Sequence, residues 1–129
     1  MKKRKKMLQP QELRIGNLVY SLETNDIQKI RGINEEYVSI DTVTFDYVSY
    51  DEIEPIPLTE EWLLKFGYIG NEPIFSEIST IFTNGIHKIW KPFNKFLDDT
   101  YRFEINYVHQ LQNLYFALKG EELQFKQTT

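Results

Sequence analysis

Hydrophobic and polar positions form two amphipathic segments in this chain, each with clear helix start and stop signals. The first, residues 55–68, reads PIPLTEEWLLKFGY. The hydroxyl of Thr59 can accept an unpaired backbone N–H of a first helical turn, which predicts a helix over 60–66. Gly67 can adopt the left-handed backbone that ends helices. So short a helix must rely on packing of its apolar side.

The second segment, residues 106–123, reads NYVHQLQNLYFALKGEEL. Apolar residues such as Val108 and Leu111 recur at helical spacing. This periodicity predicts a C-terminal helix that begins near Asn106 and ends at Gly120.

Short stretches between residues 13 and 57 alternate apolar and polar positions, as half-buried strands do. Gly32 interrupts one of them and predicts a β-bulge. Several short strands with tight connections predict a small antiparallel sheet or a small barrel.

The middle of the chain carries one strong signal, the dipeptide Asn84-Gly85, which is typical of a two-residue hairpin turn. It predicts a β-hairpin between residues 74–82 and 86–90. We also expect a turn at Asp98-Asp99, a strand over 101–105 and a short edge strand over 121–125.

Together these patterns predict an α+β protein. A small antiparallel β-sheet or barrel is followed by a short helix, a β-hairpin and a C-terminal helix packed on the sheet. Residues 1–12 form a basic, flexible leader in this interpretation. Residues 13–129 form a single domain with two halves, 13–57 and 58–129.

Composition narrows the class of protein. Of 129 residues, 41% are hydrophobic and 15% aromatic, enough to bury a core. The absence of cysteine excludes disulfides, thiolate metal sites and cysteine nucleophiles. No stretch reaches the ~20 apolar residues of a membrane span, and no signal-peptide pattern follows the basic start. We therefore expect a soluble, cytoplasmic protein.

The charge is unevenly distributed. The formal net charge is −4, but the chain starts with five consecutive basic residues, and the remainder carries −9. An acidic body argues against a broad phosphate-binding surface. The basic tip is either a solubilising chain end or a nucleic-acid contact. Its residues are Lys2, Lys3, Arg4, Lys5 and Lys6.

Catalytic and metal-binding signatures are missing from the sequence. His87 and His109 are the only histidines, and no HxxxH or HExxH spacing is present, so we expect no metal and no cofactor. No phosphate-binding glycine loop or nucleophile elbow occurs. The sequence favours a protein that is not an enzyme, without deciding the question.

A polar stripe on the predicted C-terminal helix is the main candidate site. His109, Gln112 and Asn113 share one side of the helix. They form either a solvated face, a face hydrogen-bonded to the adjacent sheet, or a recognition face for a base, sugar or peptide. Four further aromatic and polar residues are binding candidates, with core packing as the alternative for the aromatic ones. They are Tyr107, Gln110, Trp62 and Tyr68.

Three stretches resemble a family of small proteins of Bacteroides-type bacteria, their prophages and phages. They are ELRIGN at 12–17, PIPLTEEWLLKFG at 55–67, and YVHQLQNLYFAL at 107–118 with GEEL after it. The family has no established activity. The resemblance implies a phage or prophage origin and a shared fold, and no reaction.

The favoured hypothesis is therefore a non-enzymatic phage or prophage accessory protein in the bacterial host cytoplasm, which binds a host or phage macromolecule. One alternative is a small-ligand binder, such as a phage anti-defence protein that sequesters a nucleotide immune signal. The other is nucleic-acid binding through the basic tip. The expected partner is a protein or a nucleotide-like ligand, no membrane is involved, and a homo-oligomer stays open.

Overall fold

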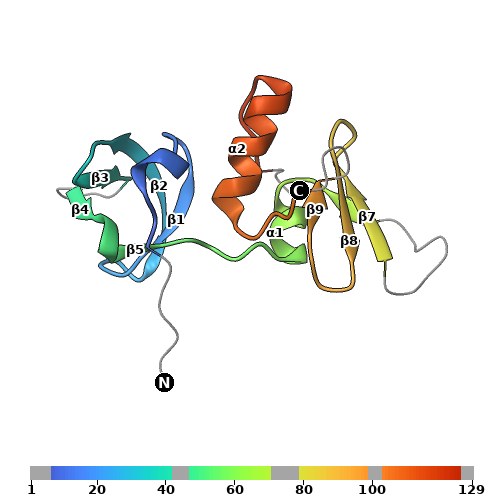
Figure 1. Cartoon of the computed structure of the whole chain (residues 1–129), viewed down its shortest axis with the longest axis horizontal. Coiled ribbons are helices and arrows are strands. Elements are labelled where there is room, and N and C mark those ends of the chain that lie inside the picture. Colours follow the sequence, from blue (N-terminus) through green and yellow to red (C-terminus); the bar gives the residue numbers. More distant parts are fainter. Residues whose placement is uncertain (1–6, 42–46, 71–78, 99–102, 126–129) are drawn as a thin grey trace. The chain divides into compact units, whose positions relative to one another are not determined.

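The computed structural model describes residues 7–41, 47–70, 79–98 and 103–125 (Figure 1). The chain divides into two compact units. Unit 1 comprises Met1–Ile56 and Val108–Asn113, and unit 2 comprises Pro57–Tyr107 and Leu114–Thr129. Across the described residues, strands form two antiparallel sheets, so the predicted α+β class is confirmed.

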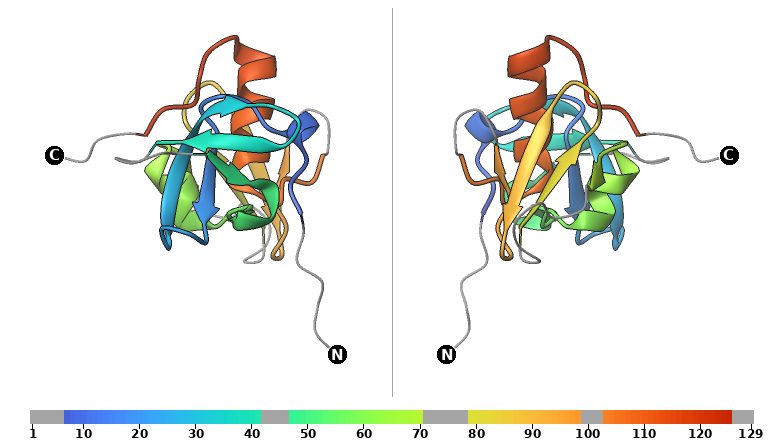
Figure 2. Two further views of the ribbon diagram at one scale, coloured as in Figure 1. Left: turned by 90° about the vertical axis from the view of Figure 1, so that its left-hand side faces the viewer. Right: turned by 90° about the vertical axis from the view of Figure 1, so that its right-hand side faces the viewer.

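Unit 1 contains a five-stranded antiparallel sheet with the strand order β4-β3-β2-β1-β5, shown in the left view of Figure 2. The strands are β1 (Leu18–Ser21), β2 (Asp26–Ile33), β3 (Tyr37–Ile40), β4 (Tyr47–Ser49) and β5 (Ile53–Glu54). The pairing register of β2 and β3 shifts between Ile30 and Gly32, which confirms the predicted bulge.

The strands of unit 1 form a sheet and not a closed barrel. Its edge strands, β4 and β5, are consecutive in the chain and are separated only by the 3₁₀ turn η2 (Tyr50–Glu52). In the described part, β4 pairs with β3 and β5 pairs with β1. The two edge strands share no ladder, so the sheet alternative is confirmed and the barrel alternative is wrong.

The core of unit 1 includes residues from the predicted flexible leader. Leu8 is 1% exposed and packs in the same cluster as Val19, Ile30 and Val38. Pro10–Glu12 form the 3₁₀ turn η1. The leader interpretation is therefore wrong for residues 8–12, because burial of Leu8 anchors this segment; residues 1–6 lie outside the described residues.

Unit 2 contains a four-stranded antiparallel sheet with the order β6-β7-β8-β9. Its elements are the helix α1 (Glu60–Lys65) and the strands β6 (Ile69–Gly70), β7 (Ser79–Thr83), β8 (Lys88–Pro92) and β9 (Leu97–Asp98). The β7–β8 hairpin, yellow in the right view of Figure 2, turns through residues 84–87, which include the predicted Asn84-Gly85, and its second strand begins at Lys88 and not at residue 86. Residues 71–78, where that hairpin was expected to begin, lie outside the described residues.

The predicted signals of α1 are confirmed. Oγ1 of Thr59 accepts a hydrogen bond from the backbone N–H of Trp62 at 3.2 Å. Gly67 has φ 86°, the left-handed conformation expected after the last turn. Trp62 and Leu63 are buried, so the short helix is stabilised by packing.

The C-terminal helix α2 (Val108–Lys119) begins two residues after the predicted start and is followed by Gly120 at φ 75°. Residues 108–113 of α2 belong to unit 1, and its remaining residues belong to unit 2. Of the described residues, none forms a helix long and apolar enough to cross a membrane.

Two local predictions in unit 2 are wrong, and a third lies partly outside the described residues. Asp98 lies in β9 and not in a turn, because it pairs with Ile89 of β8. Residues 121–125 form no strand. Of the strand predicted over 101–105, the described residues 103–105 form only an isolated bridge between Glu104 and Leu97.

Candidate functional site

The predicted polar stripe of α2 lies within unit 1, facing the segment that precedes β1. Gln112 is 3% exposed and bonds to the backbone of that segment twice. Its Oε1 accepts from the N–H of Leu18 at 2.8 Å, and its Nε2 donates to the carbonyl of Gly16 at 3.1 Å. The side chain thus provides hydrogen-bond partners for backbone groups at the start of β1.

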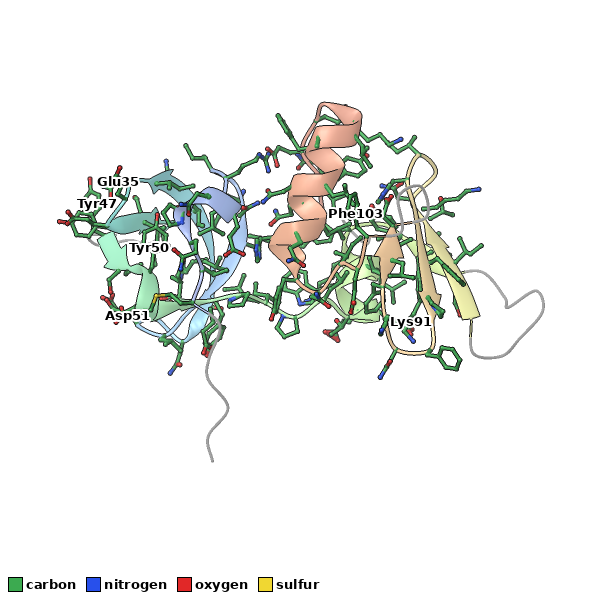
Figure 3. All side chains as sticks on the ribbon, viewed as in Figure 1. Glu35, Tyr47, Tyr50, Asp51, Lys91 and Phe103 are labelled. Atoms are coloured by element: carbon green, nitrogen blue, oxygen red, sulfur yellow. The ribbon has the colours of Figure 1, made fainter. Side chains whose placement is uncertain are left out.

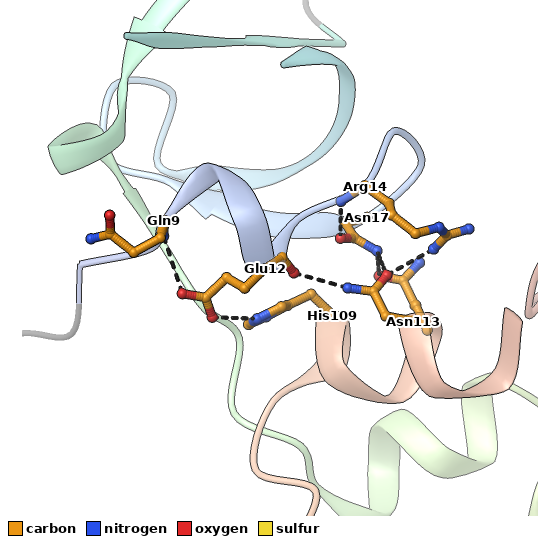
Figure 4. A network of polar contacts seen from close by, with 7 residues as sticks. Gln9, Glu12, Arg14, Asn17, His109 and Asn113 are labelled. Atoms are coloured by element: carbon orange, nitrogen blue, oxygen red, sulfur yellow. Dashed lines mark hydrogen bonds and ion pairs between the residues drawn. The ribbon is translucent and has the colours of Figure 1, made fainter. Parts of the chain in front are cut away.

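Asn113 extends these contacts along the same segment (Figure 4). Its Oδ1 accepts from Nη1 of Arg14 at 2.7 Å and from Nδ2 of Asn17 at 2.8 Å. Its Nδ2 donates to the carbonyl of Glu12 at 2.9 Å. Donors and acceptors of this amide are therefore used within the protein.

His109 completes the stripe. It is 0% exposed, and its Nε2 lies 3.1 Å from Oε1 of Glu12. Oε2 of Glu12 accepts from the backbone N–H of Gln9 at 3.1 Å, so the carboxylate joins η1 to the helix. The stripe holds residues 9–18 on α2 and is not an exposed recognition face, which corrects that interpretation. A binding role for these residues stays a prediction.

The other predicted site residues are dispersed. Gln110 is half-buried in unit 1, and Tyr107 forms an isolated bridge with Pro57 in unit 2. Trp62 and Tyr68 are buried in unit 2, at 8% and 0% exposure. The basic tip, Lys2 to Lys6, lies outside the described residues.

A buried hydrogen-bonded chain in unit 2 was not predicted. The hydroxyl of Tyr68 and Nδ1 of His87 are 2.7 Å apart, and Nε2 of His87 lies 2.8 Å from Oδ1 of Asp98. Burial raises the pKa of Tyr68 well above its ordinary value, and electrostatic repulsion from the ionised form of Tyr115 and from Asp98 raises it further. Tyr68 therefore keeps its proton at physiological pH.

These three hydrogen-bonded side chains have the order of an acid–base relay, but they are buried and a substrate cannot reach them. Tyr68, His87 and Asp98 are 0%, 4% and 1% exposed. A general base must come within hydrogen-bond reach of the proton that it removes, and the burial of these side chains keeps a substrate from that distance. We interpret the chain as a buried polar connection between β9, the hairpin and the end of α1.

A hollow of about 460 Å³ in unit 2 has aromatic and acidic walls. The rings of Phe66 and Phe125 line this hollow and are stacked, with their centroids 4.9 Å apart. The ring of Tyr115 also lines it. Glu121 and Glu122 also line it. Carboxylates at this position disfavour an anionic ligand.

A pair of exposed tyrosines marks the outer face of the sheet in unit 1. Tyr37 on β3 and Tyr47 on β4 are 44% and 68% exposed. Their ring centroids are 5.9 Å apart at an interplanar angle of 61°. Tyr37 pairs with Ser49 and Ser39 pairs with Tyr47, so the two rings are diagonal neighbours on one face.

The turn before β3 adds acidic groups beside this pair. Asn34 Oδ1 accepts from the N–H groups of Glu36 and Tyr37, both at 2.8 Å, which fixes the turn. Glu35 and Glu36 are exposed and line an open hollow of about 380 Å³ with Tyr37. Figure 3 labels Glu35 and Tyr47 here. We call Glu35, Glu36, Tyr37 and Tyr47 the tyrosine surface.

Part of this surface was visible in the sequence. Two tyrosines three residues apart on a strand point to opposite faces, so the sequence alone predicts that at least one of Tyr47 and Tyr50 is exposed or meets the second half of the protein. The structure confirms this, because Tyr47 is exposed and Tyr50 is buried with its hydroxyl donating to the carbonyl of Asn34 at 2.6 Å. The diagonal neighbour Tyr37 was missed, because its position depends on strand register.

The described residues contain no group of three or more histidine or acidic side chains placed to hold a metal ion. No family model matches this chain, and no curated protein or solved structure is detectably similar to it. The tyrosine surface therefore has to be interpreted from its own geometry.

Proposed function

We propose that this protein is a non-enzymatic accessory protein that binds a macromolecule, and that the tyrosine surface of unit 1 contacts the partner. The observation that carries the proposal is the exposed ring pair of Tyr37 and Tyr47. Tyrosine presents a large contact area at a low cost in side-chain entropy, and it is enriched among the residues that dominate binding energies. Both strands that present the rings are paired, so the surface is preformed.

The contacts of the polar stripe support this proposal over a nucleotide binder. The amide groups of Gln112 and Asn113, which made a small polar ligand attractive, bond to residues 12–18. The hollow of unit 2 has the volume of a small-ligand pocket, but its walls include Glu121 and Glu122. A phosphate-bearing ligand would meet repulsion there. Origin in a phage or prophage, which the sequence resemblance implies, fits a small binding protein.

Site-specific crosslinking tests the proposal. A photoreactive phenylalanine analogue is placed at Tyr47, and the protein is irradiated in a lysate of Bacteroides-type cells. We expect one saturable crosslinked product that unlabelled protein competes away and that Tyr37→Ala in the same chain removes. The analogue at Ile15, which is 62% exposed in unit 1, is the matched control and is expected to give no such product. If positions 47 and 15 behave alike, the tyrosine surface is not the contact surface.

A further inference from the structure

We infer that the partner segment of the tyrosine surface is a lysine- or arginine-rich peptide, a conclusion that rests on the function proposed above. Residues 7–56, which include the tyrosine surface, carry ten acidic and three basic side chains, a formal charge of −7. Lys2 to Lys6 also belong to unit 1 and add five positive charges, so that unit 1 and unit 2 each have a formal charge of −2. The negative charge around the tyrosine surface is therefore local, and it attracts a cationic side chain placed there.

The acidic groups of the tyrosine surface are available to a partner. In the described part of the chain, no hydrogen bond or ion pair involves the carboxylates of Glu35 and Glu36. The two arginines among the described residues of unit 1 have contacts at other places. Arg14 donates to Asn113, and Arg31 pairs with Asp41 at 3.1 Å. Among the described residues, no ion pair neutralises the carboxylates beside Tyr37.

The rings of Tyr37 and Tyr47 also favour a cationic side chain. The edge-to-face arrangement of Tyr37 and Tyr47 leaves ring faces open to solvent, as their exposure shows. A lysine or arginine side chain is attracted to a tyrosine face within about 6 Å of the ring centre. Its stem can pack on the ring while its charged end reaches Glu35 or Glu36. Tyrosine faces and carboxylates together therefore favour a cationic side chain over a purely apolar one.

The negative charge of Glu35 and Glu36 also favours a basic peptide over other classes of macromolecule. A nucleic acid or an anionic membrane surface presents phosphates, which Glu35 and Glu36 repel. A basic peptide brings several positive charges to a surface whose surroundings are negative, which raises the association rate at low salt. Charge complementarity thus commits the proposal to a basic peptide segment of a protein.

Fluorescence anisotropy of the full chain with a labelled probe tests the inference. The probe is a short peptide in which lysine and arginine alternate with glycine and serine. The control peptide carries glutamine in place of every basic residue. We expect the basic probe to bind at low salt and to weaken as salt screens the charges, and the glutamine peptide not to bind. Equal binding of both peptides would overturn the inference.

Variants assign the binding to the tyrosine surface. Tyr47→Ala is expected to weaken binding about fivefold, and Tyr47→Phe to retain it, because the ring face is kept. Glu35→Gln with Glu36→Gln is expected to weaken binding about tenfold at low salt. Glu121→Gln, which removes an exposed carboxylate of unit 2, is the matched control and should bind as the parent does. Unchanged affinity of the Glu35/Glu36 variant would overturn the inference.

The two proposals fail in different ways. A specific crosslink at Tyr47 together with no binding of the basic probe keeps the contact surface and removes the basic partner. Self-association of the full chain, abolished by Tyr47→Ala with no probe binding, would assign the surface to a second copy and also overturn the inference. Absence of the crosslink overturns the proposed function itself. Thermal unfolding of each variant checks that the exposed substitutions leave the fold intact.

Discussion

The two units each bury one histidine against a carboxylate, and the carboxylates differ in their contact with water. In unit 1, His109 lies 3.1 Å from Glu12, whose side chain is 26% exposed. In unit 2, His87 lies 2.8 Å from Asp98, whose side chain is 0% exposed. A buried carboxylate depends wholly on protein partners, whereas an exposed one keeps part of its hydration. Loss of the carboxylate is therefore expected to cost more stability in unit 2 than in unit 1.

The difference also shows how each unit is held together. In unit 1, the amides of Gln112 and Asn113 make several of the contacts that fix residues 12–18, and Glu12 is only one contact among them. In unit 2, a single chain through His87 joins residues from distant parts of the sequence. We infer that unit 1 tolerates loss of its carboxylate and unit 2 does not.

The largest effect is expected for Asp98→Ala. It leaves the buried His87 without its carboxylate, which should lower the free energy of unfolding by about 3 kcal/mol or more. Urea unfolding followed by circular dichroism measures the change. Glu121→Ala, an exposed carboxylate of the same unit, should stay within about 0.5 kcal/mol of the parent protein. Similar values for the two variants would contradict the view that the buried carboxylate of Asp98 stabilises unit 2.

The next effect is expected for Gln112→Ala. The substitution leaves the N–H of Leu18 and the carbonyl of Gly16 without this partner, at a cost of about 2 kcal/mol. Hydrogen exchange followed by NMR should show faster exchange of the Leu18 amide. Gln11→Ala, an exposed change in η1, serves as the control. An unchanged Leu18 amide would mean that unit 1 does not depend on the amide contacts.

Local chemistry explains which parts of this fold could be predicted from the sequence. The cap at Thr59, the stop at Gly67 and the hairpin turn at Asn84-Gly85 each depend on side chains within a few residues. These elements were found with bounds close to those of the structure. The bulge at Gly32 belongs to the same class, because one glycine interrupts a short alternating pattern.

Contacts between distant residues explain what was missed. The partners of Gln112 lie more than ninety residues earlier in the chain, so helical periodicity showed the stripe but not what it contacts. Asp98 was assigned to a turn because Asp99 follows it, whereas its burial depends on His87 eleven residues away. The tyrosine surface needs the register of β3 and β4, which alternation within a single strand does not define.

A smaller effect at neutral pH, with a distinct pH dependence, is expected for Tyr68→Phe. Loss of the bond to His87 should cost about 1 kcal/mol. Because the pKa of Tyr68 is raised in the folded protein, the unfolded chain releases this proton first, near pH 10. Stability from this group is complete below that pH and falls above it, roughly tenfold in the folding equilibrium per pH unit.

Urea unfolding across the alkaline range measures this dependence. The parent protein should lose stability more steeply above pH 10 than Tyr68→Phe does. Tyr47→Phe, whose ring is exposed in unit 1, should keep the parent slope. If Tyr68→Phe loses stability above pH 10 as steeply as the parent protein does, the hydroxyl of Tyr68 is not the buried acid that its position in unit 2 indicates.

The smallest effect on the free energy of unfolding is expected for Glu12→Gln. Asp98→Asn is the corresponding substitution in unit 2. A glutamine at position 12 keeps one oxygen, which can still accept from His109 or from the N–H of Gln9, and water reaches the site to replace the other contact. The cost should stay below about 1 kcal/mol, as for other partly exposed pairs. Asp98→Asn should cost clearly more, since no water replaces the lost carboxylate oxygen in unit 2. Parallel urea titrations of both variants decide whether exposure of the carboxylate sets the difference; equal costs would show that it does not.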